Sequence, residues 1–149
     1  MFQFVTGNLL ESSAYALVNA VNCEGCMGKG IAYQFRLRFP EMYAEYVKLC
    51  KAQELSPGKL HCFQTEDKLI INFPTKNKWR QKSKMEYIIS GLDALIQVIR
   101  EYDIPSIAIP SLGSGNGGLL WLDVKQVIVQ KLEVISETMD ILIYEPLGK

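Results

Sequence analysis

Two glycine-rich loops carry the residue pattern with the clearest chemical meaning in this chain. The first covers residues 22–30 and reads Asn-Cys-Glu-Gly-Cys-Met-Gly-Lys-Gly, and the second covers residues 111–118 and reads Ser-Leu-Gly-Ser-Gly-Asn-Gly-Gly. Glycine lets a ligand approach the backbone closely, and successive backbone N–H groups in such a loop form a concave anion site. The two loops together predict a ligand with more than one phosphate, gripped from both sides.

Each glycine loop leaves an apolar run that is typical of a β-strand and precedes a helical pattern. The predicted strands cover residues 2–6, 16–21, 60–64, 69–73, 106–109 and 141–144. Apolar residues at helical spacing predict helices over residues 31–39, 43–50, 85–99 and about 123–135. Strands that alternate with helices predict an α/β fold, a three-layer α/β/α sandwich with a central mixed sheet. Ligands usually bind at loops that follow the strands of such a sheet.

The composition is that of an ordinary globular protein. The chain has 149 residues, of which 48% are hydrophobic and 21% charged, and its formal net charge is zero. These values predict one domain over residues 1–149 and exclude a disordered chain or a uniformly basic nucleic-acid surface. The first residues lack a basic leader followed by an apolar run, and no run approaches a membrane span. We therefore expect no membrane association, a cytoplasmic location and reduced cysteines.

A basic segment follows the strand predicted at residues 69–73. No acidic residue interrupts it between Asp67 and Glu86, and it holds Lys76, Lys78, Trp79, Arg80, Lys82 and Lys84. Basic side chains around an aromatic ring suit a phosphate backbone and a stacked base. The alternative is a solvated loop that leads into the next helix. The candidates for DNA contact are Lys78, Trp79, Arg80 and Lys82.

Five segments of the chain resemble the macrodomain family, whose α/β/α fold binds ADP-ribose. They are residues 6–10, 19–22, 27–32, 72–76 and 109–113. Within the family, the chain is most similar to the branch that holds the human terminal ADP-ribose glycohydrolase and the bacterial DNA ADP-ribosyl hydrolase antitoxins of the DarG type. Residues 72–80 and the glycine pattern that ends at Trp121 favour the antitoxins. These carry a further C-terminal region, so the resemblance implies an isolated domain or the N-terminal part of a longer antitoxin.

The resemblance implies a role for each matching residue. Asn8 and Leu9 would contact the adenine, and Asn22 the proximal ribose hydroxyls. Thr75 would lie in the ADP-ribose site, next to the residue that matches the family's catalytic lysine, Lys76. We expect Asn19 to tie down the loop backbone rather than to contact the ligand. The two walls of the diphosphate site would be formed by Gly28, Lys29, Gly30 and Ile31 on one side, and by Ser111, Leu112, Gly113, Ser114, Gly115, Asn116, Gly117 and Gly118 on the other.

Two departures from the family pattern concern catalysis. The first loop lacks the aspartate that many hydrolytic macrodomains carry there, and Gly117 takes the place of the aspartate of the human terminal glycohydrolase. Lys76 remains, with two possible chemistries. Its ammonium donates a proton to the departing base nitrogen, or its neutral amine attacks the ribose C1″. A nearby diphosphate favours the first.

The resemblance implies hydrolysis of the N-glycosidic bond between ADP-ribose and a DNA base, which reverses a toxin's modification. The implied partners are ADP-ribosylated single-stranded DNA and a cognate DNA ADP-ribosyltransferase toxin, contacted through a region outside this chain. We expect a monomer without cofactor. Two alternatives stay open: a non-catalytic reader of ADP-ribose, and a hydrolase of ADP-ribosylated protein carboxylates or of ADP-ribose-1″-phosphate.

Other residues have a structural interpretation at this point. Cys23 and Cys26 have the spacing of half a zinc site, but no second clean pair of ligands follows, so we predict no metal. His61 lies on a predicted strand and is expected to be structural. Tyr144 and Glu145 either border the adenine pocket or simply end the last strand.

Overall fold

A mixed sheet of six strands forms the middle layer of the protein, whose computed structural model describes residues 1–147. The strand order is β1-β6-β5-β2-β4-β3, and every neighbouring pair is parallel except β3 and β4. The predicted central mixed sheet is therefore confirmed. The strands are β1 (Phe2–Val5), β2 (Ala16–Val21), β3 (His61–Gln64), β4 (Leu69–Pro74), β5 (Ser106–Ile109) and β6 (Asp140–Tyr144).

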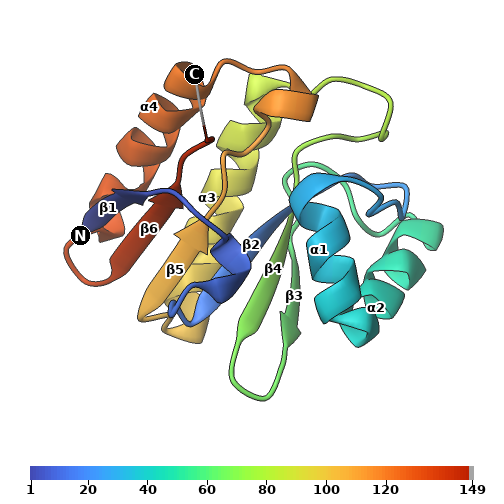
Figure 1. Ribbon diagram of the computed structural model, residues 1–149, viewed down its shortest axis with the longest axis horizontal. Helices are drawn as coiled ribbons and strands as arrows, with labels where there is room; N and C mark the ends of the chain where they lie inside the picture. The colour runs from blue at the N-terminus through green and yellow to red at the C-terminus, as the bar shows by residue number, and fades with distance from the viewer. Residues whose placement is uncertain (148–149) are drawn as a thin grey trace.

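Helices cover both faces of this sheet, which confirms the three-layer sandwich (Figure 1). On one face lie α1 (Gly30–Arg38) and α2 (Pro40–Lys51), and on the other α3 (Met85–Tyr102) and α4 (Trp121–Leu132). Three short 3₁₀ turns are η1 (Leu9–Glu11), η2 (Gly115–Gly117) and η3 (Glu133–Ile135). None of the helices within residues 1–147 has the length and hydrophobicity that a membrane crossing requires.

One helix starts earlier than predicted. We expected a helix from about residue 123 to 135, whereas α4 begins at Trp121 and the last three predicted residues form η3. The reason is the carbonyl of Leu120, which accepts hydrogen bonds from the N–H groups of Asp123 and Val124, both at 3.1 Å. The first turn of α4 thus closes on the residue directly after the second glycine loop. Trp121 is the first residue of the helix.

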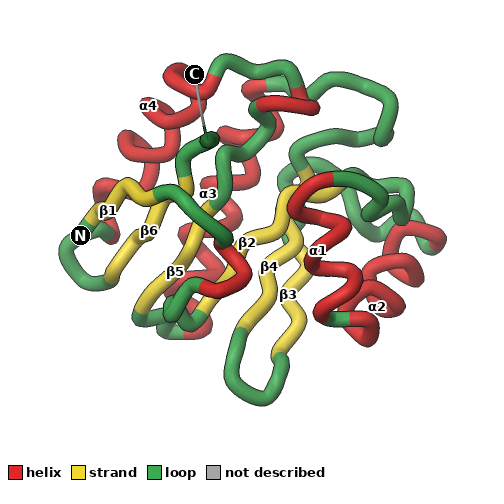
Figure 2. The backbone as a smooth tube through the Cα atoms, viewed as in Figure 1, coloured by secondary structure: helices red, strands yellow, loops and turns green. Residues whose placement is uncertain are grey.

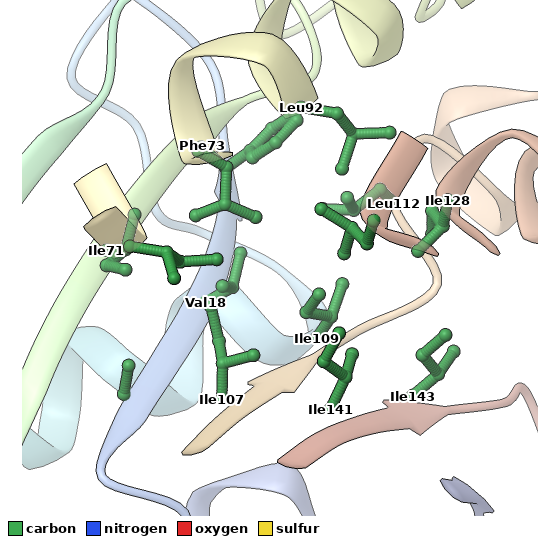
Figure 3. Close-up of a cluster of buried hydrophobic side chains, with 14 of the residues drawn as sticks. Val18, Ile71, Phe73, Leu92, Ile107, Ile109, Leu112, Ile128, Ile141 and Ile143 are labelled. Atoms are coloured by element: carbon green, nitrogen blue, oxygen red, sulfur yellow. The ribbon is translucent and has the colours of Figure 1, made fainter. Parts of the chain in front are cut away.

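The hydrophobic core has two parts, one on each side of the sheet. Figure 3 shows the larger part, where strand residues such as Val18, Ile71 and Ile109 meet Leu92 of α3 and Ile128 of α4. The second part joins alternate strand residues to α1 and α2, and it includes Leu17, Ile70, Ala108, Phe35, Met42 and Tyr46. Burial on both faces explains why β2, β4 and β5 have continuous apolar runs rather than alternating ones.

Gly91 lets α3 approach β4 closely. A Cβ atom at Gly91 would lie 2.3 Å from Cζ of Phe73, so a larger residue would push the helix off the strand. Phe73 is fully buried and stands two residues before Thr75. The packing of the Phe73 ring under α3 therefore fixes the end of β4, and the basic segment begins directly after it.

The carboxyl ends of the five parallel strands open at one edge of the sheet. Figure 2 shows the long loops gathered at this upper edge, with the β3–β4 turn at the opposite edge. After β2 the chain enters α1 on one face, and after β5 it enters α4 on the other face, although β2 and β5 are neighbours. Such a divergence opens a crevice between the two loops, where α/β proteins bind ligands.

Candidate functional site

A cleft of about 1390 Å³ lies at this edge of the sheet. Its walls come from the loops that follow β1, β2, β4, β5 and β6. Cavities for small ligands usually measure about 300–1,000 Å³. This cleft therefore has room for a dinucleotide-sized ligand with a further group attached.

Most of the predicted site residues line this one cleft. They are Asn8, Leu9, Asn22, Gly28, Lys29, Gly30, Ile31, Thr75, Lys76, Trp79, Arg80, Ser111, Gly113, Ser114, Gly115, Asn116 and Gly117. Leu112 and Gly118 were predicted in the second wall but do not line the cleft. Leu112 is fully buried in the core, and its N–H donates to the carbonyl of Pro110 at 2.8 Å. The N–H of Gly118 donates to the carbonyl of Gly115 at 3.0 Å.

Asn22 fixes the shape of the first glycine loop. Its side-chain N–H donates to the carbonyl of Cys26 at 2.7 Å, and its Oδ1 accepts from the N–H groups of Glu24 at 2.9 Å and Cys26 at 3.3 Å. The hydroxyl of Tyr46 donates to the carbonyl of Asn22 at 2.7 Å. Asn22 also lines the cleft, and its amide nitrogen uses one of its two hydrogens in the bond to Cys26.

The prediction that Asn19 holds the loop backbone is wrong, although its amide does contact this loop by donating to Sδ of Met27 at 3.7 Å. Asn19 is fully buried and pairs in register with Asn72 of β4, to whose Oδ1 its side chain donates at 3.0 Å. The parallel register of β2 and β4 places the two amides side by side within the sheet, away from the loop backbone. The side chain that holds the loop backbone is that of Asn22, three residues further along.

Both glycine loops expose their backbone to the cleft. A Cβ atom at Gly28, Gly30 or Gly115 would meet no atom within 4 Å. The first loop ends at the N-terminus of α1, where Lys29 occupies the N-cap position without a side-chain cap. Unpaired N–H groups and the helix dipole favour an anion there. In the second loop, Gly113 and Gly115 have φ values of +70° and +66°, which turn the backbone around the cleft.

Ser83 of the basic segment supports the second loop from behind. Its N–H donates to the carbonyl of Gly117 at 2.9 Å, and a Cβ atom at Gly117 would lie 2.5 Å from its Oγ. The family resemblance implies that position 117 matches an aspartate of the human terminal glycohydrolase. This chain has a serine hydroxyl in the space that such a side chain needs.

Lys76 leaves the end of β4 and reaches into the cleft. Its side chain is half-buried, and Nζ donates to the carbonyl of Trp79 at 3.3 Å. Arg80 stacks its guanidinium on the Trp79 ring at 4.6 Å from the ring centre. Trp79 and Arg80 line the cleft, whereas Lys78 and Lys82 are exposed beyond its lining.

The opposite end of the cleft is built by the loops after β1 and β6. Asn8 caps η1 by accepting from the N–H of Leu10 at 3.1 Å, which leaves its amide hydrogens free. Tyr144 and Glu145 line this end of the cleft, which agrees with the first of the two interpretations given for them from the sequence. Glu145 accepts from Lys125 at 2.8 Å and from Trp121 at 3.2 Å, and these two hydrogen bonds lower the pKa of its carboxyl.

Other lining residues were not predicted. They include Gly7, Leu10, Ala20, Val21, Cys26, Ala32, Gln34, Pro110, Pro146 and Leu147. Some had a signal in the sequence, since Gln34 lies one helical turn after Gly30 at the start of α1. Pro146 and Leu147 had none, because they belong to the cleft only through the pairing of β6 with β1.

His61 has a structural role, as predicted. It is buried, its Nε2 lies 2.7 Å from Oε1 of Glu45, and its Nδ1 lies 2.9 Å from the side-chain nitrogen of Asn72. Within residues 1–147 no group of three or more His, Cys, Asp or Glu side chains is placed to hold a metal ion.

The fold and the cleft place this chain in a known class. The chain belongs to the macro domain family, whose sequence profile matches residues 18–128. It is similar to the DNA ADP-ribosyl glycohydrolases of Mycobacterium tuberculosis and Thermus aquaticus, with 49% and 46% identity over 99% and 98% of this chain. The chain spans only 43% and 41% of the length of these relatives.

Two solved structures share the fold at high similarity. The macrodomain of Mycobacterium tuberculosis DarG superposes with a TM-score of 0.95 at 49% identity, and the match covers 98% of both chains. The structure of Thermosipho africanus DarTG in complex with ADP-ribose superposes with a TM-score of 0.92 at 31% identity. That match covers 99% of this chain and 42% of the other. The macrodomain resemblance noted in the sequence is thus confirmed.

Proposed function

We propose that this domain binds ADP-ribose and hydrolyses the N-glycosidic bond that links it to a DNA base. The observation that carries the proposal is the order of the loops along the cleft. Asn8 follows β1 at one end, the two glycine loops follow β5 and β2 in the middle, and Lys76 follows β4 at the other end. ADP-ribose has the same order, with adenine at one end, the diphosphate in the middle and the reactive C1″ at the other end.

Lys76 supplies the proton in this reaction. The C1″–N bond lengthens, the ribose becomes oxocarbenium-like, and the Lys76 ammonium protonates the departing base nitrogen. Water then adds to C1″ and gives up a proton to solvent, and the Lys76 amine takes a proton back, which leaves free ADP-ribose and an unmodified base. The diphosphate between the glycine loops stabilises the ammonium form, and so favours this route over attack by a neutral amine.

The DNA strand would lie along the basic segment that follows Lys76. Trp79 is 41% exposed and stands at the rim of the cleft beside Lys76. Its ring offers a stacking surface for a base next to the modified one, and Arg80, Lys78 and Lys82 offer cations to the phosphates. The named relatives act on DNA-linked ADP-ribose, which agrees with this arrangement.

The partner of this activity would be the enzyme that modifies the base. A relative from Thermosipho africanus, 31% identical over 97% of this chain, is named a DNA ADP-ribosyl transferase-DNA ADP-ribosyl glycohydrolase fusion protein. We propose that this domain acts as the antitoxin to a DNA ADP-ribosyltransferase. It would work as a monomer, since loops of one chain supply every proposed contact with ADP-ribose.

The decisive experiment uses a single-stranded DNA oligonucleotide that carries one ADP-ribosylated base. Release of unmodified DNA, followed on a gel, is the expected result for the wild-type domain. If no DNA is released while calorimetry shows ADP-ribose binding, the proposal is wrong, and the domain is a reader or a hydrolase of another ADP-ribose conjugate. ADP-ribose-1″-phosphate and an ADP-ribosylated glutamate peptide then separate those alternatives.

The cysteine in the cleft allows a direct test of ligand binding. Cys26 is exposed and lines the cleft, whereas burial raises the pKa of Cys23 to about 12 and that of Cys62 to about 11. Because the thiolate is the reactive form, Cys26 is expected to react first with a disulfide reagent. ADP-ribose should slow this reaction, and Cys26→Ser should remove it. A rapid thiol reaction that persists in Cys26→Ser, or whose rate does not change when ADP-ribose is added, would contradict this prediction.

Charge reversal in the basic segment tests the DNA contact. Arg80→Glu or Lys82→Glu is expected to raise the KM for modified DNA about tenfold, because each removes a cation from the phosphate path and adds a repulsive charge. The affinity for free ADP-ribose should change less than about twofold. Lys59→Glu, in the turn before β3, is the matched control. An equal loss of affinity for both ligands would refute the assignment of this surface to DNA.

A further inference from the structure

The peptide groups of Trp79 are held by two side chains from different parts of the chain. The N–H of Trp79 donates to Oε1 of Glu24 at 2.9 Å, and its carbonyl accepts from Nζ of Lys76 at 3.3 Å. Glu24 belongs to the first glycine loop, and Lys76 belongs to the segment after β4. Trp79 thus connects the first glycine loop to Lys76.

The segment between β4 and α3 has few other attachments. It contains no helix or strand, and its backbone is fixed near its two ends. At one end the carbonyl of Asn77 accepts from the N–H of Cys23 at 3.0 Å, and at the other Ser83 donates to Gly117. Within residues 1–147, Glu24 makes the only side-chain hydrogen bond that joins this segment to another part of the chain.

Glu24 is itself well placed to hold Trp79. Its own N–H donates to Oδ1 of Asn22, the side chain that shapes the first glycine loop. Its carboxylate accepts from a backbone N–H within a segment rich in cations, and hydrogen bonds to an ionised acceptor are stronger than neutral ones. The first glycine loop therefore sets the position of Glu24, and Glu24 in turn sets the position of the Trp79 peptide.

We propose that Glu24 is a positioning residue that sets the place of Lys76 through the Trp79 peptide. This inference rests on the proposed role of Lys76. When the carboxylate is present, the Trp79 carbonyl stays within reach of Nζ and directs the lysine into the cleft. When it is absent, the middle of the segment moves, and the proton donor is displaced from the departing base without any change in the diphosphate walls.

Three variants test this inference by activity. Glu24→Ala is expected to lower kcat on modified DNA about tenfold, since small displacements of a reacting group have large effects on rate. KM and the Kd for ADP-ribose should stay within about twofold. Glu24→Gln keeps an acceptor oxygen and should recover most of kcat, and Glu66→Ala, in the exposed β3–β4 turn, is the matched control. An unchanged kcat, or a loss of ADP-ribose affinity as large as the loss of kcat, would overturn the inference.

A second readout does not depend on activity. The chain has two tryptophans, so Trp121→Phe leaves Trp79 as the sole tryptophan, whose emission is followed by selective excitation at the red edge of indole absorption. In this background Glu24→Ala should increase quenching of Trp79 by acrylamide, and Glu24→Gln should not. If quenching is the same in all three, Glu24 does not hold the segment. If the wild type is inactive on modified DNA, the proposed function fails, while quenching still decides whether Glu24 positions Trp79.

Discussion

Replacement of Lys76 by alanine is expected to lower kcat on ADP-ribosylated DNA by at least about 100-fold, the usual contribution of a general acid. The base nitrogen would have to leave without the proton that the ammonium supplies. The Kd for ADP-ribose should change less than about threefold, because Lys76 lies beyond the two loops proposed to hold the diphosphate. Single-turnover rates on the modified oligonucleotide and calorimetry with ADP-ribose provide the two measurements.

The matched control for this variant is Lys59→Ala. Lys59 is exposed, lies in the turn before β3 and does not line the cleft, so it shares the charge of Lys76 without its position. We expect its kcat to stay within about twofold of the wild type. If Lys76→Ala retains normal turnover, the proton comes from elsewhere and the proposed mechanism is wrong.

Introducing an aspartate at position 117 is expected to damage the second glycine loop and to weaken ADP-ribose binding. In Gly117→Asp the new Cβ would meet Oγ of Ser83, which lies 2.5 Å from that position. Overpacking of this kind costs about 1–3 kcal/mol, so the free energy of unfolding should fall by about 2 kcal/mol. The second glycine loop would shift with it, and the affinity for ADP-ribose should fall at least about tenfold. Chemical denaturation and calorimetry measure the two effects.

A pair of substitutions shows whether contact with Ser83 causes the expected loss of stability at position 117. Gly117→Ala alone should be destabilised, because its Cβ takes the same place. Combined with Ser83→Gly, it should regain most of the lost stability, since the added methyl group then fills the space that Oγ and Cβ of Ser83 left. Normal stability and ADP-ribose affinity in Gly117→Asp would mean that the loop accommodates a carboxylate after all.

Much of the fold could be predicted from local patterns. The continuous apolar runs at β2 and β5 gave their bounds as the structure has them, and the apolar stripe of α3 was clear from its spacing. The neighbours of each strand were not predictable in this way. β1 pairs with β6, the last strand, and such a pairing depends on the packing of the whole sheet rather than on the residues around either strand.

The candidate site divides in the same manner. The glycine loops and Lys76 were predicted because glycine spacing and the family resemblance are local signals. The pairing of Asn19 with Asn72 was missed, since it depends on the register of β2 against β4. The contacts of Ser83 with Gly117 and of Glu24 with Trp79 join loops far apart in the chain, so no pattern within either loop could predict them.

The pairing of the first strand with the last has a consequence for biosynthesis. On the ribosome β1 emerges first and stays unpaired until β6 has been made, because its residue Phe2 pairs with Ile141. Asn8 follows β1, Tyr144 ends β6 and Glu145 follows it, so the end of the cleft proposed to bind adenine is assembled last. The glycine loops and Lys76 are already translated by then. A nascent chain therefore completes the proposed adenine site only after nearly the whole domain has left the exit tunnel.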